Sequence, residues 1–299
     1  MSNISEKKQG VLGRLALLAT TLIWGTSFVI LKNVLDSIDT LYVLAFRFSG
    51  AAVLLFLLGI PQLKKLDRGY LKGGAAMGLF LFIAYVLQTY GLLYTTPGIN
   101  AFLTASYCIL VPFLYWLISR RKPDKYNITA AVVCITGMAF IFLRDGLKGG
   151  LGETLTVCSS LFFSLHIIAT DRSADGRSPV LLSMLQFVVA AVLAWIFALC
   201  TGPLPTSISS GAIGSIAYLC VMCTAVCFLL QTIGQKYTPP TSSSVILTLE
   251  SVFGTAFSVM LGQEELSLRL VLGFALIFCA VLISETKLSF LKRKKQKTD

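Results

Sequence analysis

Apolar residues in this chain fall into ten blocks of about 20 residues, separated by short polar stretches. A helix rises about 1.5 Å per residue, so a block of this length crosses the roughly 30 Å hydrocarbon core of a bilayer. The blocks therefore predict an all-α membrane protein with about ten transmembrane helices. Their expected ranges are 12–31, 41–59, 72–93, 98–118, 127–143, 151–170, 179–200, 209–232, 240–261 and 267–285.

The scarcity of charged residues argues against a soluble protein. Only 13% of the 299 residues are charged, about half the usual share of roughly 25% in soluble domains. A soluble chain of this size would need a polar shell around its core, and these charges are too few to provide one. The net charge of +11 does not indicate a nucleic-acid partner, because the Lys and Arg residues lie between apolar blocks and at the chain ends.

Those basic residues instead predict the orientation of the chain. With ten spans both termini lie on one side of the membrane. The segments on that side carry 20 of the 25 Lys and Arg residues, and the opposite loops carry 4. Cytoplasmic loops are enriched in Lys and Arg. We therefore expect a multi-pass plasma-membrane protein with both termini in the cytoplasm and a basic cytoplasmic tail over residues 290–299.

Eight cysteines lie within or at the edges of the apolar blocks. Disulfide frameworks belong to short secreted domains, so we expect free thiols that pack as small apolar side chains. The spacing of Cys220, Cys223 and Cys227 is similar to that of some metal ligands, but no His or acidic residue lies near them in the sequence. We expect no metal site and no cofactor.

The chain carries an internal repeat. Residues 87–97 match residues 230–240 at seven of eleven positions, so that Leu87 aligns with Leu230. Nearer the start of each half, a slightly shorter offset aligns Arg47-Phe48 with Gln186-Phe187. The repeat predicts two five-helix halves, over residues 1–145 and 146–289.

The odd number of spans in each half determines how the halves are related. Five crossings reverse the direction of the chain, so the second half must be inverted relative to the first about an axis in the membrane plane. Inverted repeats are typical of secondary transporters, because each half can offer the same site to the opposite side. A duplication that serves packing alone is the alternative.

Short motifs recur along both halves. In the first half they are Ile23-Trp24-Gly25-Thr26-Ser27-Phe28, Phe46-Arg47-Phe48, Tyr90-Gly91-Leu92-x-Tyr94-Thr95, Ala101-Phe102-Leu103-Thr104 and Val111-Pro112. In the second half they are Gln235-Lys236-Tyr237-Thr238, Leu249-Glu250-Ser251-Val252-Phe253 and Leu261-Gly262-Gln263-Glu264. In this order and spacing the set resembles the EamA-type members of the drug/metabolite transporter superfamily over nearly the whole chain.

This resemblance implies ten helices around a central cavity, alternating access, and transport of small metabolites such as amino acids or related compounds. Export is the direction that we favour. The family usually has Glu-Pro-Val where this chain has Glu250-Ser251-Val252. Without that proline we expect the ninth span to be straighter than in the family.

Two charged residues lie well inside predicted spans, Arg47 in the second and Glu250 in the ninth. A charge at the bilayer centre costs roughly 2.5–3.5 kcal/mol on insertion scales, so both side chains should face protein or water. Arg47 could bind an anionic group of a substrate through its planar donors, or form a structural pair with Glu250 or with helix carbonyls. Glu250 could bind substrate and couple transport to protons, or form a permanent ion pair or an interhelical hydrogen bond.

Other polar residues within spans are candidates for the lining of a substrate site. Trp24 and Ser27 lie one turn apart on one face of the first span, and His166 aligns with Ser27 at the shorter of the two offsets. Gln88 and Gln231 are equivalent in the two halves, so both halves could hydrogen-bond a substrate. Interhelical hydrogen bonds are the alternative role for His166 and for the two glutamines. The remaining candidates are Tyr85, Tyr107 and Gln186.

Small residues and one proline predict local features of two spans. Gly74 and Gly78 lie one turn apart in the third span and predict close helix packing. Pro112 lies inside the fourth span, where its missing N–H predicts a bend.

Other membrane functions were weighed against transport. An intramembrane enzyme would need a nucleophile with a base, or metal ligands. The sequence has no His-Glu-x-x-His, Gly-x-Ser-x-Gly or phosphate-binding Gly-x4-Gly-Lys-Ser/Thr motif. A channel or a lipid-handling scaffold stays open as the alternative. We expect a secondary transporter without enzymatic activity, whose partners are a small molecule and the lipid bilayer; the chain could also form a homodimer.

Overall fold

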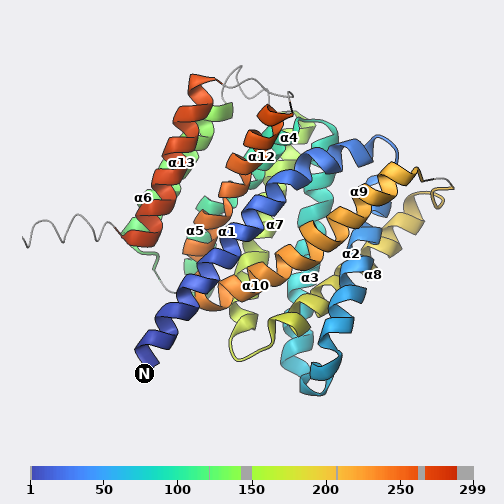
Figure 1. Cartoon of the computed structure of the whole chain (residues 1–299), viewed down its shortest axis with the longest axis horizontal. Helices are drawn as coiled ribbons and strands as arrows, with labels where there is room; N and C mark the ends of the chain where they lie inside the picture. Colours follow the sequence, from blue (N-terminus) through green and yellow to red (C-terminus); the bar gives the residue numbers. More distant parts are fainter. Residues whose placement is uncertain (1, 121, 143–149, 207, 262–266, 288–299) are drawn as a thin grey trace, which may run out of the picture.

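Nearly every residue described by the computed structural model is helical (Figure 1). The structure describes residues 2–120, 122–142, 150–206, 208–261 and 267–287. Within these ranges no strand is present, and the prediction of an all-α protein is confirmed. The helices are α1 (Ser2–Leu35), α2 (Thr40–Gly59), η1 (Ile60–Lys65), α3 (Arg68–Leu93), α4 (Pro97–Thr104), α5 (Tyr107–Ser119), α6 (Lys125–Phe142), α7 (Leu151–Ala174), α8 (Pro179–Thr201), α9 (Ser210–Cys220), η2 (Val221–Val226), α10 (Cys227–Tyr237), α11 (Pro240–Leu247), α12 (Leu249–Met260) and α13 (Leu268–Thr286).

Eight helical segments of the described chain are long and apolar enough to cross a membrane. They correspond to the predicted spans one to four and six to nine, so this is a multi-pass membrane protein. The segments are Lys8–Leu35, Thr40–Lys65, Arg68–Leu93, Pro97–Ser119, Leu151–Ala174, Pro179–Thr201, Ser210–Tyr237 and Pro240–Met260.

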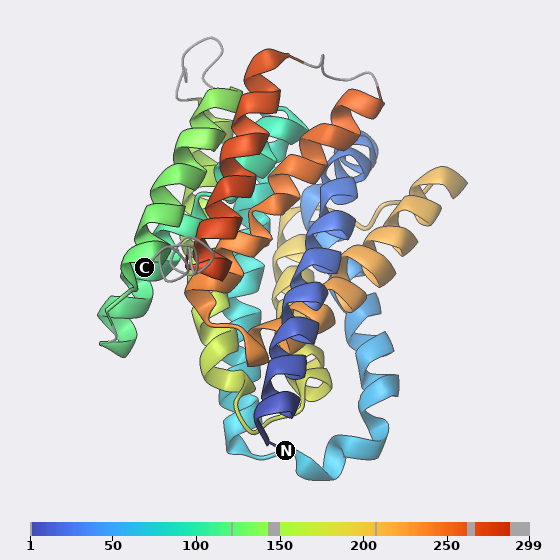
Figure 2. The same cartoon turned by 60° about the vertical axis from the view of Figure 1, so that its left-hand side comes forward.

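The predicted fifth and tenth spans correspond to α6 and α13, which pack side by side (Figure 2). Asp124 precedes α6 and Lys287 follows α13, and the two form a salt bridge of 2.8 Å. Because Lys287 donates a hydrogen bond to the Asp124 carboxylate, it lowers the pKa of that group. The boundary expected at residues 145 and 146, the motif residues 262–264 and the basic tail at 290–299 lie outside the described residues.

Short sequence signals explain where several helices begin. Proline occupies the first turn of α4, α8 and α11, where its missing N–H removes no helical hydrogen bond. The carboxylates of Asp39 and Asp67 accept hydrogen bonds of 2.9 and 2.8 Å from backbone N–H groups in the first turns of α2 and α3. These residues separate spans that the chain connects by short turns.

The fourth and ninth predicted spans are each divided into two helices by a local change in backbone hydrogen bonding. The chain leaves α4 at Ala105 and leaves α11 at Thr248, which is the equivalent position in the repeat. The hydrogen bonds after the two breaks correspond: Cys108 N–H donates to the Ala105 carbonyl and Ser251 N–H donates to the Thr248 carbonyl. Thr248 keeps a right-handed helical conformation, with φ −61° and ψ −17°. That the ninth span is straighter than in the family stays a prediction. Pro112 lies within α5, beyond the first break.

The eighth predicted span contains an irregular turn. Residues Val221–Val226, labelled η2, form a π-helix between α9 and α10. A π-helix closes its hydrogen bonds over one more residue than an α-helix does, and such turns are rare and frequent at functional sites. The segment 78–83, which aligns with η2 in the repeat, is part of the α-helix α3. No sequence feature distinguished the two segments in advance.

Glycines allow several helices to approach closely. A Cβ atom on Gly25 of α1 would lie 2.6 Å from the Cβ atom of Phe253, so α1 and α12 are in contact along their backbones. Cβ atoms on Gly74 and Gly78 would overlap α8, where Leu185 lies against Gly74. The predicted close packing of the third span is thereby confirmed.

The two expected halves pack in corresponding ways. α2 packs against α8 and α6 packs against α13, and α1 packs against α10 as α7 packs against α3. Phe48 of α2 stacks on Phe187 of α8, its equivalent in the repeat, with ring centroids 5.9 Å apart. The buried core therefore lies where the two halves meet.

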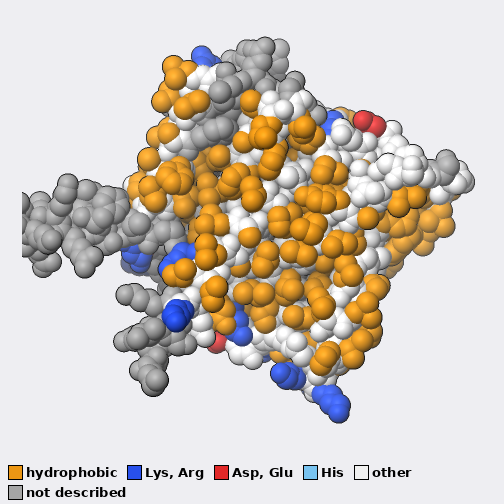
Figure 3. Space-filling model, in the orientation of Figure 1, with side chains coloured by type: hydrophobic (Ala, Val, Ile, Leu, Met, Phe, Trp, Pro, Cys, Tyr) orange, Lys and Arg blue, Asp and Glu red, His pale blue; other side chains and the backbone are white. Residues whose placement is uncertain are grey.

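The outer surface of the helices is apolar. Figure 3 shows hydrophobic side chains across the face formed by α1, α9 and α10, with most of its Lys and Arg side chains near the lower edge. Large apolar side chains such as Leu12, Leu57 and Leu117 are more than half exposed. A surface of this kind is suited to contact with lipid chains.

Candidate functional site

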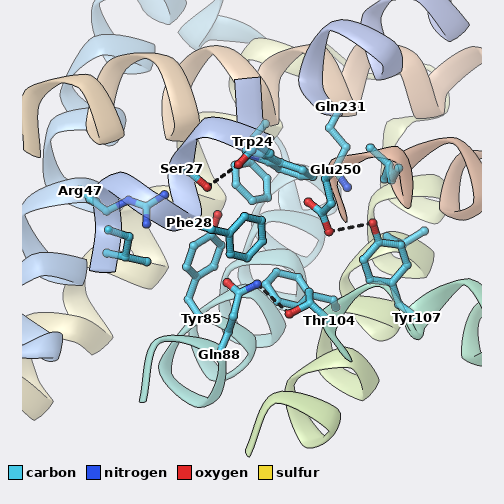
Figure 4. A pocket seen from close by; sticks show the side chains of 15 residues that line it. Trp24, Ser27, Phe28, Arg47, Tyr85, Gln88, Thr104, Tyr107, Gln231 and Glu250 are labelled. Atoms are coloured by element: carbon cyan, nitrogen blue, oxygen red, sulfur yellow. Dashed lines mark hydrogen bonds between the residues drawn. The ribbon is translucent and has the colours of Figure 1, made fainter. Parts of the chain in front are cut away.

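A cavity is lined by Thr104 and Tyr107, which flank Ala105, and by Leu247 and Glu250, which flank Thr248 (Figure 4). Measured with a water-sized sphere, its volume is about 30 Å³. This is well below the roughly 300–1,000 Å³ of typical small-molecule sites, so side chains nearly fill the cavity in this conformation. Both expected halves contribute to the lining, which consists of Trp24, Ser27, Phe28, Leu31, Arg47, Tyr85, Gln88, Thr104, Tyr107, Phe163, Ile167, Phe228, Gln231, Leu247 and Glu250.

Arg47 of α2 supplies a positive charge to this cavity. Its side chain is 1% exposed. The Nε atom donates a hydrogen bond of 3.1 Å to Thr224 Oγ1, and the guanidinium carbon lies 5.0 Å from the centre of the Tyr85 ring. No acidic residue in the described part of the chain forms an ion pair with Arg47. Its terminal nitrogens therefore remain available to a ligand.

Glu250 supplies a carboxyl group from α12, just after the break at Thr248. It is 4% exposed, and Tyr107 Oη donates a hydrogen bond of 3.0 Å to its Oε1 atom. Tyr107 of α5 is the equivalent of Glu250 in the first half. Among the described residues Glu250 has no basic partner, so the ion pair with Arg47 that the sequence allowed is not formed. Both side chains instead line the same cavity.

The equivalent glutamines both line the cavity but form different hydrogen bonds. Gln88 Nε2 donates to Thr104 Oγ1 at 3.0 Å, whereas Gln231 Nε2 donates to Gln235 Oε1 at 3.0 Å. The Oε1 atom of Gln231 is buried and has no hydrogen-bond partner among the described residues. A buried acceptor without a donor is costly, so this atom is suited to accept a hydrogen bond from a ligand.

Trp24 and Ser27 of α1 lie one turn apart at the edge of the same cavity. The Nε1 atom of Trp24 donates a hydrogen bond of 2.9 Å to the Cys223 carbonyl, and its ring lies 5.0 Å from that of Phe228. The Ser27 hydroxyl donates to the Trp24 carbonyl at 2.7 Å. Trp24 is therefore held by η2, while Ser27 is bonded within its own helix.

His166 and Gln186 do not line the cavity. His166 Nε2 and Gln186 Oε1 are 2.9 Å apart, which joins α7 to α8, and both side chains are at most 1% exposed. The His166 ring packs edge-on against Phe228, with centroids 5.7 Å apart. This bond is the interhelical role that the sequence offered as the alternative for His166. The other eight candidate residues are in the lining.

Seven lining residues were not among the candidates. Six of them are apolar, a class that is common throughout the spans and gives no local signal of a cavity. The alignment of Phe163 with Trp24 could have identified one of them. The seven are Phe28, Leu31, Thr104, Phe163, Ile167, Phe228 and Leu247.

The cysteines near the cavity contact backbone carbonyls of α1. The Sγ atoms of Cys223 and Cys227 lie 3.9 and 3.8 Å from the carbonyls of Ile23 and Thr20. Among the described residues, no group of three or more His, Cys, Asp or Glu side chains is arranged to hold a metal ion. The chemistry available at this site is hydrogen bonding, charge pairing and proton binding.

Known proteins resemble both halves of this chain. Residues 11–143 and residues 150–286 each match the EamA-like transporter family. A crystal structure of another protein superposes with a TM-score of 0.76 and covers 93% of this chain and 98% of its own. Because the two sequences are only 15% identical, this likeness shows the fold alone.

Several relatives are described as transporters. A protein of Archaeoglobus fulgidus, named an uncharacterized transporter, is 32% identical over 90% of this chain and 84% of its own length. The uncharacterized transporter YoaV of Bacillus subtilis is 22% identical over 94% of this chain and 98% of its own. The protein PecM of Dickeya dadantii is also 22% identical, over 92% and 93%. In agreement with the motifs in its sequence, this chain belongs to the EamA-like transporter family.

Proposed function

We propose that this chain is a secondary transporter that moves a small metabolite across the plasma membrane by alternating access. The main support is that Arg47 and Glu250 face one cavity, both buried, without pairing with each other. Charged groups inside a membrane are costly and are usually retained for a ligand, an ion or a proton.

We further propose that ten spans form two inverted five-helix halves, over residues 1–145 and 146–289. In a molecule with two-fold symmetry, residues on the axis contact their own counterparts. Two contacts in the core join residues that are equivalent in the repeat: the stacked rings of Phe48 and Phe187, and the hydrogen bond between Tyr107 and Glu250. The basic residues support a cytoplasmic location for both termini.

The charges of the cavity favour a substrate with ionic groups and an apolar part. The guanidinium of Arg47 complements a carboxylate, and the carboxylate of Glu250 complements an ammonium group. Aromatic rings, including those of Trp24 and Phe228, provide an apolar wall. We propose an amino acid or a related compound as substrate, and export as the direction. The proposed substrate-binding residues are the eight candidates in the cavity lining. His166 and Gln186, which lie outside the lining, are proposed to support it.

Glu250 is the proposed site of proton coupling. Its carboxylate can hold a proton or a cationic group of the substrate, but not both. Outward movement of substrate bound to the carboxylate would then alternate with inward movement of a proton bound to the same oxygen atoms. Tyr107 donates a hydrogen bond to this carboxylate and would orient it in both steps.

Counterflow in proteoliposomes tests the proposal. Purified protein would be reconstituted with a panel of radiolabelled amino acids, and pH and sodium gradients would be varied independently. We expect saturable counterflow of at least one compound and acceleration by a proton gradient. Arg47→Gln should lower the rate at least about tenfold by removing the paired charge. Glu250→Gln should slow exchange, because the ammonium group loses its partner, and the remaining exchange should no longer depend on pH. Lys64→Gln, in exposed η1, is the matched control.

Other outcomes would identify an error in the proposal. Wild-type, pH-dependent transport by Glu250→Gln would remove the assigned proton carrier. Solute flux that neither saturates nor shows counterflow would favour a channel. Movement of a labelled lipid between leaflets, in the absence of solute flux, would favour a lipid-handling scaffold.

A further inference from the structure

The π turn η2 changes the backbone hydrogen bonds around Cys223. In an α-helix the N–H of Cys227 would donate to the Cys223 carbonyl, four residues earlier. Here that N–H donates to the carbonyls of Met222 and Thr224 instead. The Cys223 carbonyl, to which this N–H does not donate, accepts a hydrogen bond of 2.9 Å from the indole of Trp24. The π turn thereby provides the acceptor that holds one cavity residue in place.

The same turn holds Arg47 through Thr224, which is fully buried. The Thr224 hydroxyl donates to the Leu219 carbonyl at 2.7 Å. Its single proton is used in that bond, so its oxygen can only accept from Arg47 Nε, at 3.1 Å. This is the only hydrogen bond of Arg47 within the described ranges. In that part of the chain, nothing else occupies the two adjacent terminal nitrogens of the guanidinium.

The other half of the chain lacks this arrangement. The segment 78–83 of α3 aligns with η2 and is an ordinary α-helix. The residues that align with Arg47 and Trp24 are Gln186 and Phe163. Gln186 binds His166, and its Nε2 atom has no partner among the described residues. The π turn therefore occurs in the half that contacts Arg47 and Trp24. Both side chains donate hydrogen bonds to residues of this turn.

We infer that η2 is the positioning element of the substrate site, and that Thr224 sets the orientation in which Arg47 presents its two terminal nitrogens to an oxyanion such as a carboxylate. The inference rests on the proposed function, in which Arg47 binds an anionic group. Two adjacent N–H donors match the two oxygens of a carboxylate, whereas an unrestrained guanidinium would lose this geometry. Thr224 acts through Arg47 and is not itself in the cavity lining.

A binding experiment with simple probes tests this inference on the full-length protein in detergent. Trp116→Phe and Trp195→Phe leave Trp24 as the only tryptophan, so its fluorescence reports on the cavity. The probes are benzoate and its neutral analogue benzamide. We expect benzoate to bind at least about tenfold more tightly than benzamide, as for a charge-assisted pair. Thr224→Val should remove this preference, and Thr224→Ser, which keeps the hydroxyl, should retain it.

Two further measurements separate positioning from a general loss of structure. In Thr224→Val the Trp24 emission without probe should be unchanged, because its acceptor is the Cys223 carbonyl. Arg47→Lys keeps the charge but lacks the planar fork, so it should lose the benzoate preference, even if Thr224→Val does not fold.

Three results would overturn the inference: equal binding of the two probes to the parent protein, an undiminished benzoate preference in Thr224→Val, or an undiminished preference in Arg47→Lys. Failure of the proposed function would be seen separately. The parent protein would then catalyse no solute counterflow, while the benzoate preference and its dependence on Thr224 persisted.

Discussion

Gly25 links the packing of the molecule to the geometry of its cavity. It follows Trp24, which lines the cavity, and it faces α12, the helix that carries Glu250. A Cβ atom at this position would lie 2.6 Å from Phe253 Cβ and 2.9 Å from the backbone nitrogen of Gly254. Hydrogen as a side chain therefore allows α1 and α12 to bring their functional residues to one site.

Gly25→Ala should destabilise the protein by about 1–3 kcal/mol, the usual effect of overpacking. The backbone of α12 cannot move aside as a flexible side chain would. Gly214→Ala is the matched control, because a Cβ atom there has no neighbour within 4 Å and alanine favours a helix. Reversible unfolding in mixed micelles would compare the two variants. Equal stability would show that the helices can separate at Gly25 without cost.

Polar residues of the site were easier to predict than apolar ones. Arg47, Glu250, Gln88 and Gln231 stand out in sequence because polar groups are rare and costly inside spans. His166 was a candidate because it is polar, lies within a span and aligns with Ser27, another candidate. Its side chain instead contacts Gln186 of the neighbouring helix α8. A repeat alignment does not show whether a side chain faces the cavity or a neighbouring helix.

The helices themselves show a similar division. Their order and most boundaries follow from apolar blocks and from proline or Asp at helix starts. The interruptions in the fourth, eighth and ninth spans do not, because no proline or glycine marks Ala105, Thr248 or the segment 221–226. In η2 the side chains that donate to the turn, Trp24 and Arg47, come from the opposite half of the chain, so no local pattern indicates these contacts.

Deletion of Met222 should convert η2 into an α-helical turn. A π turn holds one residue more than an α-helical turn. Without that residue the Cys227 N–H can donate to the Cys223 carbonyl, and the side chains of α9 and α10 keep their orientation. The chain should fold, and Trp24 emission should shift because its indole loses an acceptor. Deletion of Leu79, the aligned residue in α3, is the control. The α-helix α3 contains no π turn at this position. Deletion of Leu79 would therefore rotate the rest of the helix by about 100°.

Gel filtration in detergent and Trp24 emission in the single-tryptophan background would compare the two deletions. Aggregation of both would contradict the view that η2 is a local insertion. An unchanged Trp24 emission after deletion of Met222 would show that the π turn does not supply the acceptor.

At the scale of the whole molecule, the distribution of charge predicts how the chain lies in the membrane. The apolar surface over α1, α9 and α10 in Figure 3 lies in the zone where lipid is expected. Lys64 follows the second span in η1, and Thr206 lies between α8 and α9; both are exposed. Opposite sides of the membrane are expected for these two residues.

Cysteine labelling would test that orientation. The exposed Cys158, Cys200 and Cys279 would first be replaced by alanine. A membrane-impermeant maleimide added to intact cells should label Thr206→Cys but not Lys64→Cys. Permeabilised cells should show labelling of both. The reverse pattern in intact cells would place the termini outside.

The hydrogen bond between Tyr107 and Glu250 also bears on the ancestry of the chain. If a single five-helix unit once paired with a copy of itself, any residue on the dimer axis met an identical residue. Fusion of two gene copies allowed the two positions to mutate independently, so that one became a phenol donor and the other a carboxylate acceptor. A symmetric dimer has identical residues on its axis, so it could not pair a tyrosine donor with a glutamate acceptor there. Only a protein with two fused copies could form this contact.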